Sequence, residues 1–424
     1  MLLDRAATIE AAEMLATFRV LIISGARQVG KSTLASAQLG VDAGHVFSLD
    51  DPAVLGRALS DPIGFAAALP HGSVIDEFQR AGKPLLLAIK QIVDAIPDKG
   101  QFILTGSANY LAARGTTETL AGRAGRLQLW PLSIGERLGL PEQFLGQLFD
   151  DDRNWTAATA APDANDRAQI MTWILEGGFP EVVRDQLTPT RRARWFDAYT
   201  DDVVNREALR PIADVRYEHE LRRLLRALAA RIGTELVIAD VARDLGLDRA
   251  TVTNYVSILE AVNLLHLLPA FSTSATTAAK QRPKIHLVDS GLAAHLNGLG
   301  ERDLSSLSTN RLLGPMVEQF VVTEVLKQAS WSQRGVNVHH YRDREGREAD
   351  IVIEDRRTGR VAAIEVKASS TPDARGARHL TYLRDRLGDR FTIGVLLHLG
   401  PQSLPLGDRL WARPISTLWT GNGQ

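Results

Sequence analysis

The stretch LIISGARQVGKSTL, residues 21–34, decides the fold of the first third of the chain. An apolar run stops at Gly25, and Gly30, Lys31 and Ser32 complete the spacing G-x-x-x-x-G-K-S. The glycines let the loop bend so that backbone N–H groups point inward, and the helix that follows adds its positive N-terminal end. The stretch therefore predicts a loop that holds a polyphosphate between a strand and a helix.

Two side chains of this loop have specific expected tasks. We expect Lys31 to reach the β- and γ-phosphates of ATP, and the Ser32 hydroxyl to be a ligand of Mg²⁺. The context that such a loop requires is present, because a strand-like run precedes it and a helical run follows it. The predicted nucleotide-binding residues are Gly25, Ala26, Arg27, Gln28, Val29, Gly30, Lys31, Ser32 and Thr33.

The composition is that of an ordinary folded protein, with 45% hydrophobic and 23% charged residues among 424. This length predicts roughly three domains. A net charge of -1 excludes a global basic field, so any contact with nucleic acid must come from local patches. The chain has no cysteine, which excludes disulfides, thiol catalysis and cysteine-ligated zinc.

We expect a cytoplasmic protein without a membrane partner. Residues 1–15 carry acidic side chains and lack the basic lead and apolar run of a signal peptide. No stretch approaches the ~18 uncharged apolar residues of a membrane span.

Strand and helix signals alternate in the first third of the chain. Longer helical segments separate five short apolar runs, as in a parallel sheet with crossover helices, which predicts a three-layer α/β sandwich. The runs are residues 19–24, 45–49, 73–76, 101–105 and 126–130. A polar, Ala- and Asp-rich interval at 151–167 has the composition of a linker. The predicted domains are 1–150, an ATPase-type domain; 151–235, a linker and helical region; 236–300, a winged helix-turn-helix; and 301–424, an α/β tail.

Polar residues end two further apolar runs of the first domain. In GSVIDEFQR, Asp76 is placed to hold the water shell of Mg²⁺, and Glu77 to orient and deprotonate an attacking water, which favours ATP hydrolysis over binding alone. In QFILTGSANYL, Thr105, Ser107 and Asn109 end another run where the γ-phosphate should lie. One of them is the expected phosphate sensor, with Asn109 slightly preferred over Ser107.

The segments GARQVGKST, SLDDP, VIDEFQR, ILTGSAN and ETLAGRAGRLQLWPLS together resemble the prokaryotic AAA-type ATPases of the AAA+ and STAND-like group. The resemblance implies that an arginine completes the site from a neighbouring segment or subunit, and the matching candidates are Arg123 and Arg126. An arginine donated to a neighbour would imply a homo-oligomer. The alternative is that both arginines are solvated side chains before an edge strand.

Residues 237–268 have the pattern of a helix-turn-helix. A helix ends near Gly246, Asp248 is an N-cap candidate, and a second helix starts at Arg249. A strand and a helix over 283–296 favour a winged form. Candidate DNA contacts are Arg249, Thr251, Thr253 and Asn254, with wing contacts to phosphates from Lys280, Arg282 and Lys284. The competing hypothesis is a winged helix that packs on the ATPase domain as a regulatory partner.

Two strands are predicted in EADIVIEDRRTGRVAAIEVKAS, residues 348–369, with a tight turn between them. Glu365 and Lys367 are two residues apart and share one face of their strand. A two-residue loop at 357–358 would pair Asp350 with Glu365, and a loop at 358–359 would pair it with Lys367. Either register clusters the three side chains.

Asp350, Glu365 and Lys367 match the D…E-x-K of the PD-(D/E)XK nuclease core, which this constellation resembles. The resemblance implies that residues 301–424 form a restriction-endonuclease-like α/β domain. Two carboxylates would bind Mg²⁺ or Mn²⁺, which activates a water, and the lysine would neutralise charge. Glu318, from the helical stretch GPMVEQFVVTEVL, is a candidate further metal ligand. Ordinary cross-strand ion pairing would produce the same residue types.

These patterns are compatible with two functions. The first is an ATP-binding, Mg²⁺-dependent ATPase coupled to a nucleic-acid-binding tail that is a candidate metal-dependent nuclease. The second is a STAND-like regulatory ATPase whose C-terminal half binds a partner without cleavage. Near-neutral charge favours the second, and the D…E-x-K residues favour the first.

Overall fold

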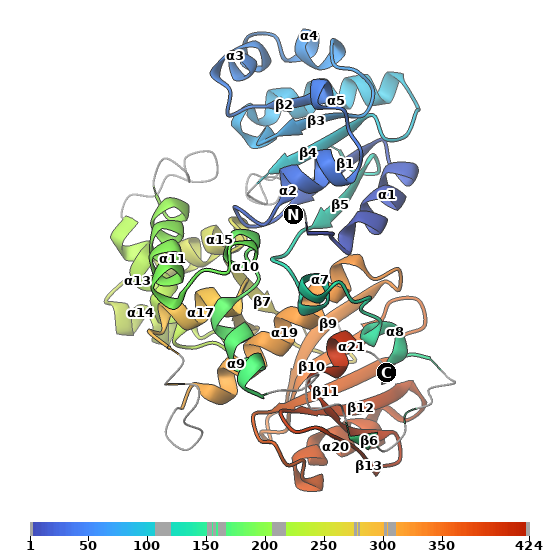
Figure 1. The fold of residues 1–424 in the computed structure, drawn as a ribbon, viewed down its shortest axis with the longest axis vertical. Coiled ribbons are helices and arrows are strands. Elements are labelled where there is room, and N and C mark those ends of the chain that lie inside the picture. Colours follow the sequence, from blue (N-terminus) through green and yellow to red (C-terminus); the bar gives the residue numbers. More distant parts are fainter. Residues whose placement is uncertain are drawn as a thin grey trace.

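A computed structural model describes residues 3–106, 120–150, 155, 158–159, 167–205, 218–274, 278, 280–300, 303 and 311–420. The candidate phosphate sensors Ser107 and Asn109 lie outside these ranges. Figure 1 shows the blue N-terminal region (the head) at one end and the orange and red C-terminal region (the tail) at the other. The green and yellow helices between them form the middle region.

The head is built on one parallel sheet, which confirms the predicted α/β architecture. Its strand order is β2-β3-β4-β1-β5, and neighbouring strands pair in parallel. The strands are β1 (Val20–Ser24), β2 (Val46–Ser48), β3 (Ser73–Asp76), β4 (Phe102–Gly106) and β5 (Ala124–Gln128). Each contains or overlaps one of the five apolar runs, since buried parallel strands are short and continuously apolar.

Helices cover both faces of the head sheet. Leu21 and Ile23 point into one core with α1, whereas Val20 and Ile22 point into another with α3, α4 and α5. This alternation follows from the period of two along a strand. The helices of the head are α1 (Ala7–Thr17), α2 (Lys31–Thr33), α3 (Pro52–Ser60), α4 (Pro62–Ala67) and α5 (Gly82–Ala95).

The middle region is helical and contains the elements of the expected helix-turn-helix. Helix α14 is followed by Gly246 in a left-handed conformation (φ 69°), and the Asp248 side chain accepts a hydrogen bond from the Thr251 N–H at the start of α15. Strands β7 and β8 then pair antiparallel. The elements are α9 (Arg167–Glu176), α10 (Pro180–Arg184), α11 (Pro189–Val203), α13 (Glu218–Ala229), α14 (Ile238–Leu245), α15 (Arg249–Ala261), β7 (Leu265–Leu268), β8 (Lys284–Leu287) and α17 (Ser290–Leu296).

The tail contains a seven-stranded mixed sheet in the order β6-β13-β14-β12-β11-β10-β9. Helix α19 packs on the face with Ile351 and Ile364, and α20 packs on the face with Val352 and Ala363. Its strands are β9 (Val336–Arg342), β10 (Glu348–Asp355), β11 (Val361–Lys367), β12 (Phe391–His398), β13 (Gln402–Gly407) and β14 (Leu410–Pro414), and its helices are α19 (Leu313–Trp331), α20 (Arg378–Leu387) and α21 (Thr417–Thr420).

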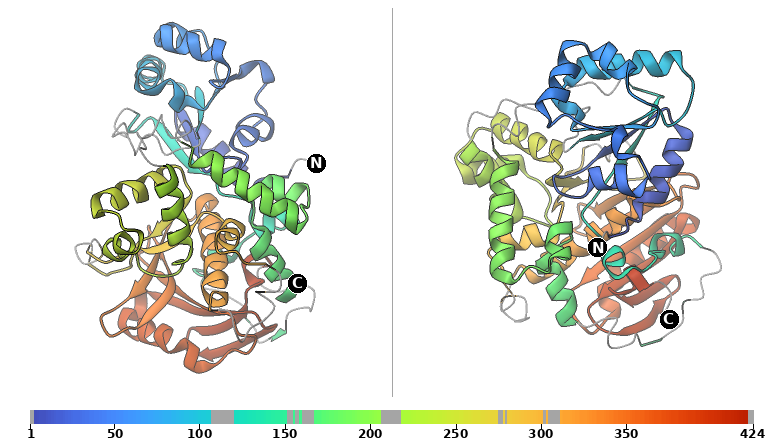
Figure 2. Two further views of the ribbon diagram at one scale, coloured as in Figure 1. Left: turned by 90° about the vertical axis from the view of Figure 1, so that its left-hand side faces the viewer. Right: turned by 45° about the horizontal axis from the view of Figure 1, so that its top comes forward.

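The segment between head and middle region differs from a simple linker. Strand β6 (Ala158–Thr159) lies in the interval with linker composition, yet it pairs with β13 at the edge of the tail sheet. Helices α7 (Ile134–Leu138) and α8 (Phe144–Gln147) come before it and contact α21. The left view of Figure 2 shows the yellow helices of the middle region beside the orange part of the chain. Within the described residues, no helix is both long enough and apolar enough to cross a bilayer.

Candidate functional site

The loop of residues 25–30 lies at the carboxyl end of β1 and leads into α2. Two glycines are required by its geometry. A Cβ atom on Gly25 would lie 2.2 Å from the carbonyl oxygen of Leu129. Gly30 has a φ of 93°, a backbone conformation that residues other than glycine rarely adopt. The sequence thus fixes both the close approach to the strand end and the entry into α2.

Lys31 is folded into the loop. Its Nζ donates to the carbonyl oxygens of Ala26 (2.8 Å) and Gly25 (3.2 Å), and the residue is buried. Burial lowers the pKa of Lys31 to about 8, against the opposing effect of the nearby Glu77 and Asp76 carboxylates. The ammonium is therefore held where a phosphate bound by the loop would meet it.

Three side chains from different elements converge beside Lys31. The Ser32 Oγ donates to Asp76 Oδ1 at 2.9 Å, and the Thr105 hydroxyl donates to the same oxygen. Asp76 and Thr105 are register partners on β3 and β4, at the carboxyl ends of both strands. The hydroxyl and carboxylate oxygens are the ligand types that Mg²⁺ prefers, so Ser32 and Asp76 fit the metal expected there. Bound there, Mg²⁺ would neutralise charge on the phosphates.

Glu77 follows Asp76 directly and has an unusual backbone conformation. Its φ of 54° is left-handed, which is uncommon for a residue that is not glycine. The Gln79 side chain donates to Glu77 Oε2. Backbone strain of this kind concentrates at functional sites, and the Glu77 carboxylate is near enough to Lys31 to act on the pKa of that lysine.

The two candidate finger arginines lie elsewhere in the head. Arg123 immediately precedes β5, at the amino end of the parallel sheet, and forms an ion pair with Asp94 in which Nη2 lies 3.0 Å from Oδ2. Arg126 is exposed within β5, in register with Ile22 of β1. The 25–30 loop is at the opposite, carboxyl end of the sheet from Arg123. A role for either arginine at a neighbouring subunit stays a prediction.

Arg5 supports the nucleotide loop, and no sequence pattern predicted this role. Its guanidinium donates to the carbonyl oxygens of Val29 (2.7 Å) and Trp130 (2.7 Å) and to Glu136 Oε1 (2.9 Å). Arg5 and Glu136 are both buried, and Glu136 completes a capping box with Ser133 at the start of α7. One arginine therefore joins the nucleotide loop to α7.

Helix α19 of the tail binds residues 132–136, the segment that contains Glu136. The N–H of Ile134 donates to Glu324 Oε2 at 2.9 Å, and Lys327 Nζ donates to the carbonyl oxygen of Leu132 at 2.9 Å. Lys327 also pairs with Glu324 at 2.6 Å. Residues 132–136 are thus bound both to the head and to the tail.

The predicted tail residues come together at the end of β11. Strand β10 pairs with β11 so that Ile351 faces Ile364, and continuing this register by one residue places Asp350 opposite Glu365. This is the first of the two expected registers. The Lys367 Nζ lies 2.6 Å from Glu365 Oε1, and the Val366 N–H donates to Asp350 Oδ2 at 2.8 Å.

A lysine that was expected at a wing lies inside this cluster. Lys284 Nζ is 2.8 Å from Glu318 Oε1, 2.6 Å from Glu348 Oε1 and 3.3 Å from Asp350 Oδ1. Its side chain is completely buried, so the prediction that Lys284 contacts nucleic-acid phosphates is wrong. Strand β8 packs against α13 and α17 of the middle region and against α19 of the tail, and this packing buries the lysine.

Burial also changes the acidity of the cluster. It raises the pKa of Glu318 to about 8 and, with the nearby Asp350, the pKa of Glu365 to about 8. Burial opposes the charged form of Lys284, but the surrounding carboxylates outweigh it and raise the pKa of this lysine. Among the residues that the structure describes, no three His, Cys, Asp or Glu side chains are arranged to hold a metal ion. The metal set expected from Asp350, Glu365 and Glu318 thus stays a prediction.

One face of α15 is available to a partner. Arg249, Thr253, Asn254 and Ser257 are exposed, whereas Thr251 is partly covered and bonded to Asp248. Arg282 is also exposed, in the turn before β8. The exposed face combines hydrogen-bonding side chains with a single cation, which is a modest nucleic-acid signal.

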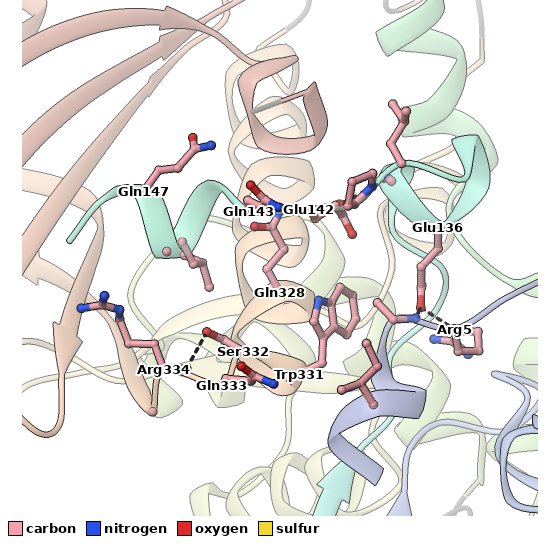
Figure 3. A pocket seen from close by; sticks show the side chains of 18 of the residues that line it. Arg5, Glu136, Glu142, Gln143, Gln147, Gln328, Trp331, Ser332, Gln333 and Arg334 are labelled. Atoms are coloured by element: carbon pink, nitrogen blue, oxygen red, sulfur yellow. Dashed lines mark hydrogen bonds and ion pairs between the residues drawn. The ribbon is translucent and has the colours of Figure 1, made fainter. Parts of the chain in front are cut away.

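A cavity of about 1130 Å³ opens between the head and the tail (Figure 3). Arg5 and Glu136 lie on one side of it, and Gln328, Trp331 and Arg334 lie on the side of α19 and the turn that follows. Among the described residues, none that line this cavity is a predicted site residue. The cavity adjoins the Arg5–Glu136 pair and so the support of the nucleotide loop.

Three family matches divide the chain. Residues 17–138 match the AAA domain family, and residues 167–303 and 313–418 match two domains of unknown function, DUF8612 and DUF4143. An uncharacterized protein of Mycobacterium tuberculosis is 25% identical over 404 residues, which cover 95% of this chain and 81% of that protein. A counterpart in Mycobacterium bovis matches to the same extent.

Solved structures with similarity include the RuvB Holliday junction branch migration motor of Thermotoga maritima. It is 21% identical, with 62% of this chain and 89% of that chain covered and a TM-score of 0.29. The DNA clamp loader delta protein of Bacillus subtilis is 13% identical, with 60% and 88% covered and a TM-score of 0.26. The AAA match and the geometry at 25–33 agree, and the chain therefore contains an AAA-type P-loop ATPase domain.

Proposed function

We propose that this protein hydrolyses ATP with Mg²⁺ at residues 25–33, and that its C-terminal half engages nucleic acid under control of the nucleotide. The observation that carries the proposal is the convergence of Ser32 and Thr105 on Asp76 beside the buried Lys31. Loop N–H groups and Lys31 would hold the phosphates, and Glu77 would orient the attacking water. Asn109 remains the proposed phosphate sensor, and Arg123 and Arg126 the proposed finger residues of an oligomer.

Replacing Lys31 tests the nucleotide site. Lys31→Ala removes a charged donor to two phosphates, each hydrogen bond being worth about 1.5–3 kcal/mol, so ATP affinity should fall at least about tenfold. Lys83→Ala, which removes an exposed lysine of α5, is the matched control and should bind ATP normally. ATP binding is measured by titration calorimetry, with circular dichroism to verify folding. An unchanged ATP affinity in a folded Lys31→Ala protein would show that Lys31 does not contact the phosphates.

The exposed face of α15 is the proposed nucleic-acid contact, supported by Arg249, Thr253 and Asn254. Arg249→Ala should weaken duplex DNA binding and reduce the slope of log K against log salt by about 1. Arg243→Ala is the control, because that arginine is exposed on α14 and paired with Asp240. Fluorescence anisotropy at several salt concentrations measures both. Equal slopes for Arg249→Ala and the wild type would remove α15 from the interface.

Two candidate activities of the tail have separate support. Cleavage of nucleic acid is favoured by Asp350, whose Oδ2 accepts from the Val366 N–H, and by Lys367, whose Nζ lies 2.6 Å from Glu365 Oε1. A regulatory, STAND-like function without cleavage is favoured by Lys284, which lies among the carboxylates that a metal would need.

A cleavage assay separates them. Single- and double-stranded DNA and RNA are incubated with Mg²⁺ or Mn²⁺, with and without ATP. Cleavage that Glu365→Gln abolishes, while ATP hydrolysis in the head persists, would support the nuclease. Intact substrates under all conditions would leave the regulatory candidate.

A further inference from the structure

The carboxylate cluster of the tail is assembled from three elements around one ammonium group. Glu318 comes from α19, Glu348 and Asp350 come from β10, and Lys284 comes from β8 of the middle region. The distances from Lys284 Nζ to the three carboxylates are 2.8, 2.6 and 3.3 Å. An ammonium has three N–H donors, and here each has one acceptor.

We propose that Lys284 is the resident cation of this cluster and excludes a divalent metal from Asp350 and Glu365 while β8 stays in place. A metal bound by Asp350 and Glu318 would have to share their oxygens with a completely buried ammonium of like charge. The inference goes beyond the proposed function, because it depends neither on ATP nor on nucleic acid.

A second observation indicates that the cluster can accept a further cation once Lys284 leaves. Glu365 is 6% exposed, and its Oε2 is buried and has no hydrogen-bond partner among the described residues. Its other oxygen accepts from Lys367. A buried carboxylate oxygen without a donor is costly, and either a proton or a bound cation relieves that cost.

The backbone around Lys284 explains why the ammonium stays in the cluster. The Ile285 N–H donates to the Thr234 carbonyl oxygen at 2.9 Å, and the Gly233 N–H donates to the Ile285 carbonyl oxygen at 2.9 Å. Lys284 is also the register partner of Leu268 on β7. The lysine is therefore anchored in the middle region, whereas its acceptors belong to the tail. Separation of the two regions would withdraw the cation and leave carboxylates that repel one another.

Manganese titration of the full chain, without nucleotide or nucleic acid, tests the proposal. Free Mn²⁺ is measured by electron paramagnetic resonance for the wild type, Lys284→Met and Lys284→Met/Glu365→Gln. Methionine keeps the length of the lysine stem and removes the ammonium. Lys83→Met is the matched control, because Lys83 is an exposed lysine in the head.

Lys284→Met should bind one Mn²⁺ at least about tenfold more tightly than the wild type, and Glu365→Gln in that background should abolish the gain. Lys83→Met should titrate like the wild type. A folded Lys284→Met protein without this gain would overturn the proposal, as would a gain that Glu365→Gln leaves intact.

A wild-type measurement keeps the proposal falsifiable if Lys284→Met does not fold. The wild type and Glu365→Gln should have identical Mn²⁺ titrations, because the resident ammonium already keeps metal away from Glu365. A wild-type Mn²⁺ site that Glu365→Gln removes would refute the proposal directly. Loss of DNA binding or ATP hydrolysis in separate assays would count against the proposed function and would not affect this result.

Discussion

Arg5→Met should destabilise the head and weaken ATP binding together. The substitution keeps the aliphatic stem and deletes a guanidinium that donates to Glu136 and to the carbonyl oxygens of Val29 and Trp130. Glu136 would stay buried, with the N–H groups of Ala6 (2.8 Å) and Ser133 (2.9 Å) as donors. Removing one partner of a buried ion pair costs about 3–5 kcal/mol.

Because the N–H groups of Ala6 and Ser133 still donate to Glu136, the free energy of unfolding should fall by about 3 kcal/mol, the lower end of the range for a broken buried ion pair. For a cooperative unit of 150–250 residues this corresponds to a fall in Tm of about 6–12 °C. Arg57→Met removes an exposed arginine of α3 and should change stability by less than about 0.5 kcal/mol. Calorimetric melting and ATP titration measure the two effects. A loss below about 1 kcal/mol with normal ATP affinity would refute the role of Arg5.

Three further outcomes are expected. Glu77→Gln keeps shape but loses the base, so it should bind ATP and hydrolyse it at least about 100-fold more slowly, as a phosphate-release assay would reveal; wild-type turnover would remove Glu77 from the mechanism. Because the pKa of Lys31 is lowered to about 8, deprotonation above that pH removes the positive charge that meets the phosphates. The ATP affinity of the wild type should therefore decline from pH 8 to pH 9.5, whereas the affinity of Lys31→Arg should change less over this range. A wild-type affinity that does not change with pH would contradict this. Gly25→Ala should lose ATP binding because its Cβ would meet Leu129 at 2.2 Å, whereas Gly56→Ala, with open space around it, should gain up to about 1 kcal/mol in a thermal melt.

Local patterns were sufficient for the head. The apolar runs at 19–24 and 73–76 became β1 and β3, and the polar residues that end such runs meet at one sheet edge because all strands are parallel. That geometry brings Ser32, Asp76 and Thr105 together, although Ser32 and Asp76 are 44 residues apart in the chain and Asp76 and Thr105 are 29 apart. The D…E-x-K residues of the tail likewise followed from a single hairpin, which fixes its own register.

Long-range packing decided the features that local patterns missed. Lys284 belongs to a basic, turn-rich segment, which is typical of an exposed wing, and only the burial of β8 beside α19 places it among carboxylates. Arg5 is a single arginine beside Asp4, just before a helix, and its partners are 24, 125 and 131 residues away. Strand β6 has two residues in a polar interval, too few to carry a period.

The attachment of residues 132–136 to both Arg5 and α19 has a thermodynamic consequence. Glu324, which holds this segment, and Glu318, which faces Lys284, are six residues apart on one helix, a rise of about 9 Å. If occupation of the nucleotide loop changes the affinity of the tail for a cation by some factor, the cation must change the affinity for the nucleotide by the same factor. For Lys284→Met, a cation titration with and without nucleotide and a nucleotide titration with and without cation would then give the same coupling constant.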